Sequence, residues 1–456
     1  MPVLADGQRR NILGAVDADP RTAAAGPVPS IIPSRNISPD RIDPDALKVV
    51  RRLQRFGFQA YLVGGCVRDL LLHRTPKDFD VATSALPNQV RKVFRNCRLI
   101  GRRFRLAHIH FQKKIIETAT FRACDPDTGQ NPDDPLIRSD NVFGTQSEDA
   151  LRRDFTCNAL FYDPVARELI DYVGGLEDLV SRTIRFIGPP ALRVREDPVR
   201  ILRAIKFAAR LGFSIDPPAW AAMVRYRHEL IRSAPARVLE EVLRMLRGGA
   251  AETSFRLMWQ AGLLDVLLPE VAAFLARAPE RGEIRDPGIG MWAYLRAADR
   301  WRREPLSDPV LLAALFLHPM LDAHRNGGRP YDLGEKPGGL GEVAGRMMRG
   351  LVARLHLPKW QVERIQQIVS LQKRLSELRR ADAIPRWMNQ RAHLAEALDL
   401  LQLGFMASGA GEAALVRLGR LEGRAAPPAQ PPRRKRRRRS RRPSPVASPA
   451  DQGSGA

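Results

Sequence analysis

Two short segments near the start of the chain carry residues suited to phosphate and metal chemistry. Gly64 and Gly65 follow the apolar run of residues 60–63, and Asp78 and Asp80 stand further along, separated by one phenylalanine. Glycines let the backbone approach phosphate oxygens without a Cβ in the way, and a helix that begins there adds free N–H groups. Carboxylates two positions apart on a strand project from one face, and Mg²⁺ and Mn²⁺ both accept carboxylate oxygens. The two segments together predict a site for a nucleoside triphosphate and divalent cations.

A third carboxylate would complete a site for two ions, and the sequence offers two candidates. Glu117 lies in a predicted strand over residues 115–121 that can pair beside the strand of Asp80, although a surface glutamate on an amphipathic strand explains it equally well. Asp154 follows two arginines, and this cluster combines donors for phosphate or ribose with an acceptor for a hydroxyl. A salt bridge at a helix end is the structural alternative for Asp154. Both carboxylates remain candidates for a site that activates a hydroxyl and stabilises leaving pyrophosphate.

A further group of polar residues precedes a predicted helix over residues 198–211. Asp197 is expected to be its N-cap, with the following proline as the first helical residue, and Gly212 is expected to end it. Arg200 shares a helix face with Asp197, so a carboxylate acceptor and a guanidinium donor can address the Watson–Crick edge of a base together. Structure alone also explains these residue types at a helix start.

Two kinds of periodicity divide the chain into an α/β part and a helical remainder, which is the α+β fold class. Strands are predicted at residues 60–63, 79–82, 106–111 and 115–121, with helices at 67–72 and 87–94. Further helices are predicted at 198–211, 236–247, 254–267, 340–355, 358–378 and 391–403. A stretch rich in Asp, Pro, Gly and Asn at residues 123–140 predicts a mobile loop.

These patterns suggest five segments. They are a disordered N-terminal extension (1–44), a catalytic domain (45–188), a helical neck (189–265), a helical body (266–424) and a disordered Arg-rich tail (425–456). The neck is expected to select the nucleotide and to bind RNA together with the body.

The charge balance points to a polyanionic partner. The net charge is +24, which nucleic acid or an anionic membrane surface would complement. Residues 433–442 carry nine positive charges in ten positions. A solvated, repulsive tail and a flexible RNA tether both explain that run, and the tether is favoured because each neutralised phosphate releases counterions. The apolar run at residues 309–321 is shorter than the roughly 20 residues that a membrane span needs, and no secretory leader is apparent, which predicts a cytoplasmic protein.

The motifs resemble those of a known family. The Gly-Gly and Asp-x-Asp signature within residues 62–81 is similar to that of the nucleotidyltransferase superfamily. Residues 151–160, Leu-Arg-Arg-Asp-Phe-Thr-Cys-Asn-Ala-Leu, resemble a motif of the class II tRNA nucleotidyltransferase and poly(A) polymerase family, with Cys157 where relatives often carry Ile. The Glu-Asp-x-x-Arg segment at 196–200 completes the set in the expected order. The resemblance implies a polymerase-beta-like mixed α/β domain followed by an all-helical half.

The same resemblance implies roles for individual residues. Asp78, Asp80 and Glu117 would hold Mg²⁺ or Mn²⁺, and Asp154 would join them as a catalytic carboxylate. The implied nucleotide-binding residues, with ATP as substrate, are Gly64, Gly65, Arg68, Arg152, Arg153, Glu196, Asp197 and Arg200. The RNA-binding residues expected from their charge are Arg102, Arg103, Arg105, Arg433, Arg434, Lys435, Arg436, Arg437, Arg438, Arg439, Arg441 and Arg442.

The basic segment between Asn96 and His108 resembles the bacterial poly(A) polymerase version of this strand pair, and its arginines can also hold varied RNA ends through backbone contacts. The expected activity is that of a polynucleotide adenylyltransferase, which adds AMP from ATP to RNA 3′ ends and, in the resembled family, promotes mRNA turnover. A CCA-adding tRNA nucleotidyltransferase is the alternative within the family. A catalytically idle RNA-binding protein is the alternative from another class.

Overall fold

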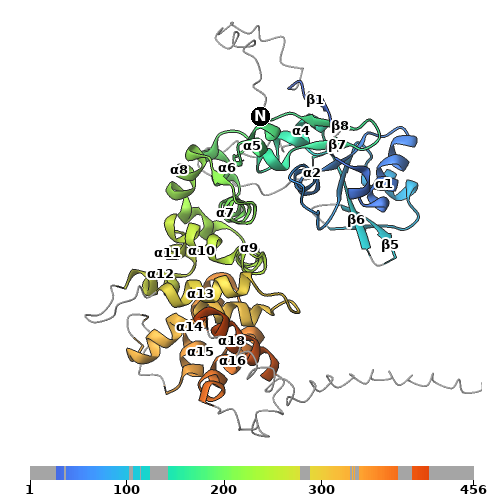
Figure 1. Cartoon of the computed structure of the whole chain (residues 1–456). Helices are drawn as coiled ribbons and strands as arrows, with labels where there is room; N and C mark the ends of the chain where they lie inside the picture. Colours follow the sequence, from blue (N-terminus) through green and yellow to red (C-terminus); the bar gives the residue numbers. More distant parts are fainter. Residues whose placement is uncertain are drawn as a thin grey trace, which may run out of the picture.

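The computed structural model describes residues 27–34, 37–101, 106–112, 114–123, 142–277, 288–328, 331, 333, 338–377 and 393–409. An α/β part lies at one end of an elongated molecule, and helices extend away from it (Figure 1). This arrangement confirms the predicted α+β fold class.

The α/β part is built on an eight-stranded sheet with the order β1-β8-β7-β2-β3-β6-β5-β4. The strands are β1 (Ser30–Pro33), β2 (Ala60–Val63), β3 (Asp80–Thr83), β4 (Cys97–Ile100), β5 (Leu106–Phe111), β6 (Lys114–Thr120), β7 (Phe161–Asp163) and β8 (Glu168–Asp171). Strand β3 pairs antiparallel to β2 and parallel to β6, which places Asp80 beside Val63 on one side and beside Glu117 on the other. Strands β2, β3, β5 and β6 confirm the four predicted strands to within one residue.

Apolar packing covers both faces of the sheet. On one face, helix α1 (Pro44–Arg55) begins where the Asp43 side chain accepts hydrogen bonds from two backbone N–H groups, and it buries Ala46, Val49, Val50 and Leu53. Each buried valine or leucine contributes about 1.5–3 kcal/mol relative to exposure. On the other face, Val63, Ala82, Phe121, Ala150, Phe161 and Ile170 form a separate buried cluster. The two clusters hold the central strands, and hence Asp80, in a fixed position.

Shorter helices and turns complete the α/β part. These are η1 (Pro39–Arg41), α2 (Gly65–Leu71), α3 (Pro87–Val93), α4 (Gln146–Leu151), η2 (Thr156–Asn158) and α5 (Gly175–Val180). The predicted absence of regular structure in residues 1–44 is wrong for β1 and η1, because β1 pairs with β8 across four residues. The predicted loop at 123–140 lies outside the described residues, except for its first residue.

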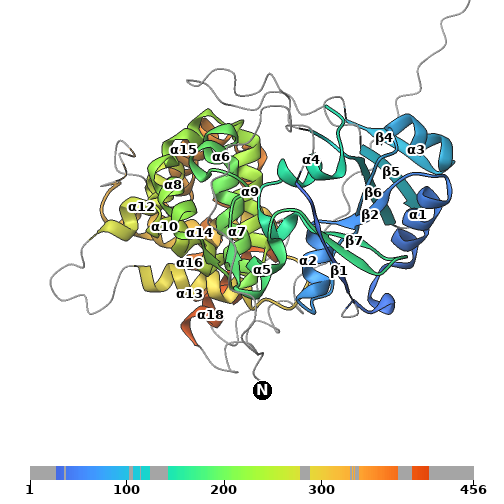
Figure 2. The ribbon, with the colours of Figure 1, turned by 90° about the horizontal axis from the view of Figure 1, so that it is seen from above.

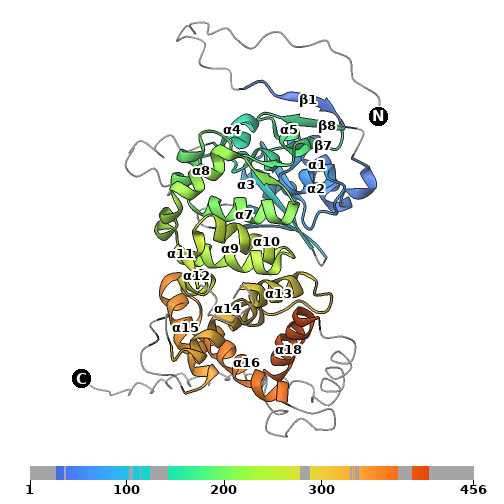
Figure 3. The same cartoon turned by 60° about the vertical axis from the view of Figure 1, so that its left-hand side comes forward.

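The helical part begins after β9 (Thr183–Ile184), which pairs parallel with β10 (Ser214–Ile215) after α7. Its elements are α6 (Pro190–Glu196), α7 (Val199–Leu211), α8 (Pro217–Arg225), η3 (Arg227–Arg232), α9 (Pro235–Arg247), α10 (Ala251–Gln260), α11 (Leu263–Leu267), α12 (Pro269–Ala276), α13 (Gly288–Asp299), α14 (Asp308–Arg325), α15 (Leu340–Leu355), α16 (Lys359–Glu377) and α18 (Leu394–Ser408). Figures 2 and 3 show α7 and α9 next to the α/β part, and Figure 3 shows α16 and α18 at the far end. None of the described helices is long and apolar enough to cross a membrane.

Helix α7 connects the two parts. One contiguous cluster of buried apolar residues runs from Ile37 in the α/β part to Leu403 in α18 and includes the buried face of α7. The helix ends as predicted at Gly212, whose φ of 71° is the left-handed conformation that suits glycine. Its predicted start is wrong by one residue, because Pro198 is the N-cap, and the Asp197 side chain accepts a hydrogen bond from Arg237 instead.

The close contact of α5 with η2 gives a test of the fold near Asp154. A Cβ on Gly175 would lie 2.2 Å from the carbonyl oxygen of Thr156. We expect Gly175→Ala to lower the free energy of unfolding by about 1–3 kcal/mol, because a backbone oxygen cannot move aside without shifting η2. Urea denaturation measures this change. The control is Gly339→Ala, where a Cβ meets no atom within 4 Å. Equal stability of the two variants would contradict the described packing.

Candidate active site

A cavity of about 760 Å³ lies between the α/β part and helices α7 and α9. Its α/β wall consists of Gly64, Gly65, Cys66, Arg68, Asp69, Lys77, Asp78, Asp80, Arg153, Asp154 and Asn158. Its helical wall consists of Arg203, Lys206, Phe207, Arg210, Glu240, Arg244, Met245, Arg247, Gly248, Ala250 and Ser254. The two segments expected to bind a nucleotide and a metal therefore meet in one cavity.

The two carboxylates of the Asp-x-Asp motif both line this cavity, but they do not stand on one strand. Asp80 begins β3, whereas Asp78 lies in the bend before it, so the prediction that Asp78 is part of the strand is wrong. Asp78 nevertheless lines the same cavity as Asp80, because the cavity lies beside the first residue of β3 and the bend directly precedes it.

Desolvation and nearby negative charge both raise the pKa of Asp80. Its side chain is accessible from the cavity, yet the surrounding protein limits its hydration, and this desolvation raises its pKa from 3.8 to about 6. Repulsion from Glu117 and Asp78 acts in the same direction, while Arg153 opposes it. A bound cation would relieve this repulsion. Two hard oxygen donors also fit Mg²⁺, which takes its remaining ligands from water and phosphates.

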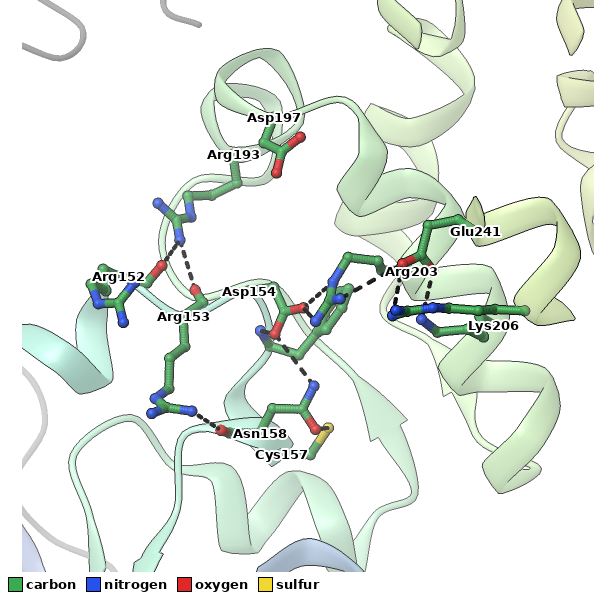
Figure 4. A network of polar contacts seen from close by, with 12 residues as sticks. Arg152, Arg153, Asp154, Cys157, Asn158, Arg193, Asp197, Arg203, Lys206 and Glu241 are labelled. Carbon is green, nitrogen blue, oxygen red and sulfur yellow. Dashed lines mark hydrogen bonds and ion pairs between the residues drawn. The ribbon is translucent and has the colours of Figure 1, made fainter. Parts of the chain in front are cut away.

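The two candidates for a third carboxylate differ in their surroundings. Glu117 is paired in register with Asp80, and its Oε1 lies 3.6 Å from Nε2 of His108. Asp154 lines the cavity but accepts hydrogen bonds at 2.7 Å from Nε of Arg203 and at 3.3 Å from Nδ2 of Asn158 (Figure 4). Among the residues that the structure describes, no group of three or more His, Cys, Asp or Glu side chains is arranged to hold a metal.

Asp154 is stabilised as a carboxylate. Burial alone would raise its pKa, but the charge and hydrogen bonds of Arg203 outweigh burial, so the pKa of Asp154 lies below its usual value. Arg203 belongs to α7, and its ion pair therefore ties the Arg-Arg-Asp motif to the helical wall. The position of Asp154 supports a role in orienting a hydroxyl more directly than a role as a metal ligand.

The glycine turn is shaped by close neighbours. Gly64 has a φ of 75°, and a Cβ there would lie 3.2 Å from Nη1 of Arg153. Glycine at this position therefore leaves room for the Arg153 guanidinium beside the open backbone. Helix α2, which follows, has seven residues, so access to the backbone matters more here than a long helix dipole.

The arginines implied in nucleotide binding are engaged with protein groups. Arg68 is buried and donates to Asp69 and to the Asn158 side chain at 2.6–2.9 Å. Arg152 and Arg153 each form an ion pair of 2.8 Å with Asp149. Arg68 and Arg153 line the cavity, whereas Arg152 lies outside its lining.

The Glu-Asp-x-x-Arg residues do not line the cavity in the described structure. Glu196 accepts hydrogen bonds from Arg193 at 2.7 Å and from Arg200 at 2.9 Å. Asp197 pairs instead with Arg237 of α9 at 2.8 Å, so the expected joint face of Asp197 and Arg200 is split between two ion pairs. Arg193 also donates to the carbonyls of Arg152 and Arg153, which links α6 to the Arg-Arg-Asp motif (Figure 4).

Sequence reasoning missed the charged residues of the helical wall. Arg203, Lys206 and Arg210 recur at spacings of three and four along α7, which is a detectable signal, but the pattern does not reveal which face meets the sheet. Burial lowers the pKa of Lys206, and its 2.5 Å pair with Glu241 of α9 opposes that shift. The expected RNA-binding residues Arg102, Arg103, Arg105 and those of the tail (433–442) lie outside the described residues.

The mixed sheet, the Gly-Gly turn and the cavity carboxylates define a nucleotidyltransferase. The fold is similar to that of the Bacillus stearothermophilus CCA-adding enzyme in complex with CTP, with a TM-score of 0.57 and 24% identity, covering 84% of this chain and 82% of that one. A model of the poly A polymerase head domain matches residues 60–185, and a model of the probable RNA and SrmB-binding site of polymerase A matches residues 212–275.

Curated relatives identify the family. The chain is 42% identical to poly(A) polymerase I of Salmonella typhimurium over 322 residues, which are 69% of each protein. It is 37% identical to the CCA-adding enzyme of Anoxybacillus flavithermus over 266 residues, covering 58% of this chain and 66% of that enzyme. The chain therefore belongs to the family of poly(A) polymerases and tRNA nucleotidyltransferases.

The raised pKa of Asp80 predicts that its charged carboxylate lowers the stability of the metal-free protein and that a bound metal ion offsets this loss. Because the folded pKa exceeds the unfolded one, the wild type loses stability as the pH rises from about 4 to about 6, and the loss is complete above that range. We expect Asp80→Asn to raise the melting temperature at pH 7.5 by about 1–3 °C without divalent ions, since accessibility from the cavity limits the effect. Mg²⁺ should then stabilise the wild type but not the variant. A variant that melts below the wild type in metal-free buffer would contradict the raised pKa of Asp80.

The Arg203–Asp154 pair gives a second test. Arg203→Met leaves a buried carboxylate uncompensated, and we expect a loss of about 2–4 kcal/mol in unfolding free energy, while Asp154→Asn in the same chain restores part of it. Lys48→Met is the control, because the Lys48 side chain is 70% exposed and its pair with Asp45 contributes about 0.5 kcal/mol or less. Additive effects of the two substitutions would argue against the pair.

Proposed function

We propose that this chain is a template-independent poly(A) polymerase, a polynucleotide adenylyltransferase that transfers AMP from ATP to RNA 3′ ends and releases pyrophosphate. The observation that carries the proposal is the meeting of Asp78, Asp80 and the Gly64–Gly65 turn in one cavity. The choice of poly(A) addition rests on the greater identity and coverage of the poly(A) polymerase I relative over the CCA-adding relative.

In this proposal Asp78 and Asp80 hold Mg²⁺, or Mn²⁺ in its place, and Glu117 is the adjacent third carboxylate. When bound, two such ions lower the pKa of the attacking RNA 3′-hydroxyl and stabilise charge on the leaving pyrophosphate. Asp154, fixed by Arg203, orients a ribose hydroxyl. The chain otherwise contributes positioning: the reacting oxygen and the α-phosphorus of ATP are held in line within the cavity.

The nucleotide-binding roles of Gly64, Gly65, Arg68, Arg152 and Arg153 are part of the same proposal. Gly64 and Gly65 offer open backbone to the triphosphate, and Arg153 lies against that turn. For Glu196, Asp197 and Arg200 to select adenine, their present ion pairs must rearrange when ATP binds. A base whose hydrogen-bonding edge can take the place of these ion-pair partners is favoured, because a base that cannot do so leaves the charged side chains unpaired.

RNA binding is proposed for Arg102, Arg103, Arg105 and the basic run at residues 433–442, through contacts with phosphates that do not read sequence. Messenger RNA and other transcripts in the cytoplasm are the proposed substrates. The solved neighbour bound to a primer tRNA and an ATP analogue, at 22% identity and a TM-score of 0.54, shares the fold.

A direct test is to incubate the purified protein and Mg²⁺ with a short labelled RNA and each nucleoside triphosphate separately, beside a tRNA lacking its 3′ end. Long extension with ATP alone is expected. Addition of C, C and A to the tRNA followed by a stop would reassign the chain to CCA addition, and no incorporation would favour an idle RNA-binding protein.

The catalytic carboxylates are tested in the same assay. We expect Asp78→Ala to reduce AMP transfer by about 100-fold or more, in the range seen when one preorganised electrostatic contact is lost. Glu377→Ala is the control, since Glu377 is an exposed carboxylate at the end of α16. Unaltered transfer by Asp78→Ala would disprove the proposed metal site.

A further inference from the structure

The charged lining of the cavity is mostly self-compensated. Six of its cationic side chains are paired with carboxylates of the protein: Arg68 with Asp69, Arg153 with Asp149, Arg203 with Asp154, Lys206 with Glu241, Arg244 with Glu240 and Arg247 with Asp308. A guanidinium or ammonium held by a carboxylate presents little net charge to a ligand. Their partners offset the net charge of these six residues, which can still donate hydrogen bonds from fixed positions.

Lys77 and Arg210 are different. Both line the cavity and both are exposed, and within the part of the chain that the structure describes neither side chain has a hydrogen-bond or ion-pair partner. Lys77 directly precedes Asp78, and Arg210 lies in the last turn of α7. Two uncompensated cations at one cavity lower their electrostatic energy when an anion lies between them.

The loop that carries Lys77 is docked against the end of α7. Arg74 donates from Nη1 to the carbonyl of Arg210 at 3.0 Å and from Nη2 to the carbonyl of Leu211 at 3.2 Å. A cation at this position is favourable, because the last carbonyls of a helix lack intrahelical donors. Arg41 in turn donates to the carbonyl of Arg74 at 2.8 Å, which fixes the loop from its other side. Lys77 and Arg210 are therefore held on neighbouring segments.

The position of this pair favours RNA over the triphosphate as its ligand. Arg210 lies two residues before the segment 212–275 that matches the RNA-binding model, and the cavity continues along α9 within that segment. The glycine turn expected to receive the triphosphate belongs instead to the β2–α2 connection. The two free cations thus lie at the border between the carboxylates and the RNA-binding segment.

We propose that Lys77 and Arg210 form a subsite for the last phosphodiester of the RNA primer, so that the adjacent 3′-hydroxyl is brought to Asp78 and Asp80. This inference rests on the proposed function, because it assumes that RNA is the acceptor. A phosphate clamped by one cation from each wall also fixes the distance between the walls when the primer binds.

Steady-state kinetics of the full chain test the subsite through Lys77→Gln, Arg210→Gln and the double variant. Each single substitution is expected to raise the KM for a short RNA about threefold to tenfold, with the KM for ATP unchanged, since one charge-assisted contact is lost. The matched controls are Lys92→Gln in α3 and Arg51→Gln in α1, which are exposed cations outside the cavity lining. An increase in the KM for ATP alone would assign the pair to the triphosphate and overturn the proposal, as would kinetics equal to those of the controls.

Equilibrium binding separates this inference from the proposed function. Affinity for the same RNA is measured over a range of salt concentrations without ATP or divalent ions, and each variant is expected to flatten the slope of log affinity against log salt by about one. A wild type that adds no nucleotide would refute the proposed function, yet the slope would still test the subsite. Slopes equal to that of the wild type in all variants would overturn the subsite even if AMP transfer occurs.

Discussion

Repulsion between carboxylates at the centre of the sheet is the constraint on which the rest of the site depends. Asp80 begins β3 between β2 and β6, in register with Glu117 and close to Asp78, and its pKa is raised first by desolvation and then by repulsion from these two carboxylates. The chain tolerates this repulsion because the main-chain ladder fixes β3 and because apolar clusters cover both faces of the sheet. The stability of the fold thus holds Asp78, Asp80 and Glu117 close together, and this cluster becomes favourable when cations bind.

The helical wall of the cavity concentrates positive charge instead of negative charge. Cations of α7 and α9 face the same cavity, and carboxylates of the protein compensate most of them, as in the pairs Arg203–Asp154 and Lys206–Glu241. The pair Arg203–Asp154 joins the helical wall to the α/β wall, and the pair Lys206–Glu241 joins α7 to α9 within the helical wall, so both fix the geometry of the cavity as well as balancing charge. Side chains held in this way need little reorganisation when a substrate arrives, which is the basis of electrostatic preorganisation.

The sequence predicted those features that local patterns determine. Strands β2 and β3 follow from short runs of apolar and β-branched residues, helix α3 from a proline at its start, and the end of α7 from Gly212. The partners of site residues could not be predicted in the same way. Asp197 binds Arg237, 40 positions away, and Arg203 binds Asp154, 49 positions away. Helical spacing defined the faces of α7, but only the packed structure decides which face meets the cavity. The roles of all the site residues, Asp78, Asp80 and Glu117 among them, stay predictions.

Strand β1 was not predicted from sequence periodicity, and its structure depends on a partner that is distant in the sequence. It forms through pairing with β8 and is the outermost of the described strands on that side of the sheet. An open strand edge is a template for association with other chains, and proline interrupts such a template because it has no N–H to donate. Pro29 and Pro33 flank the exposed Ile31. Among the described strands, the sheet therefore ends on this side in a strand that is poorly suited to pairing edge to edge with another copy of the chain.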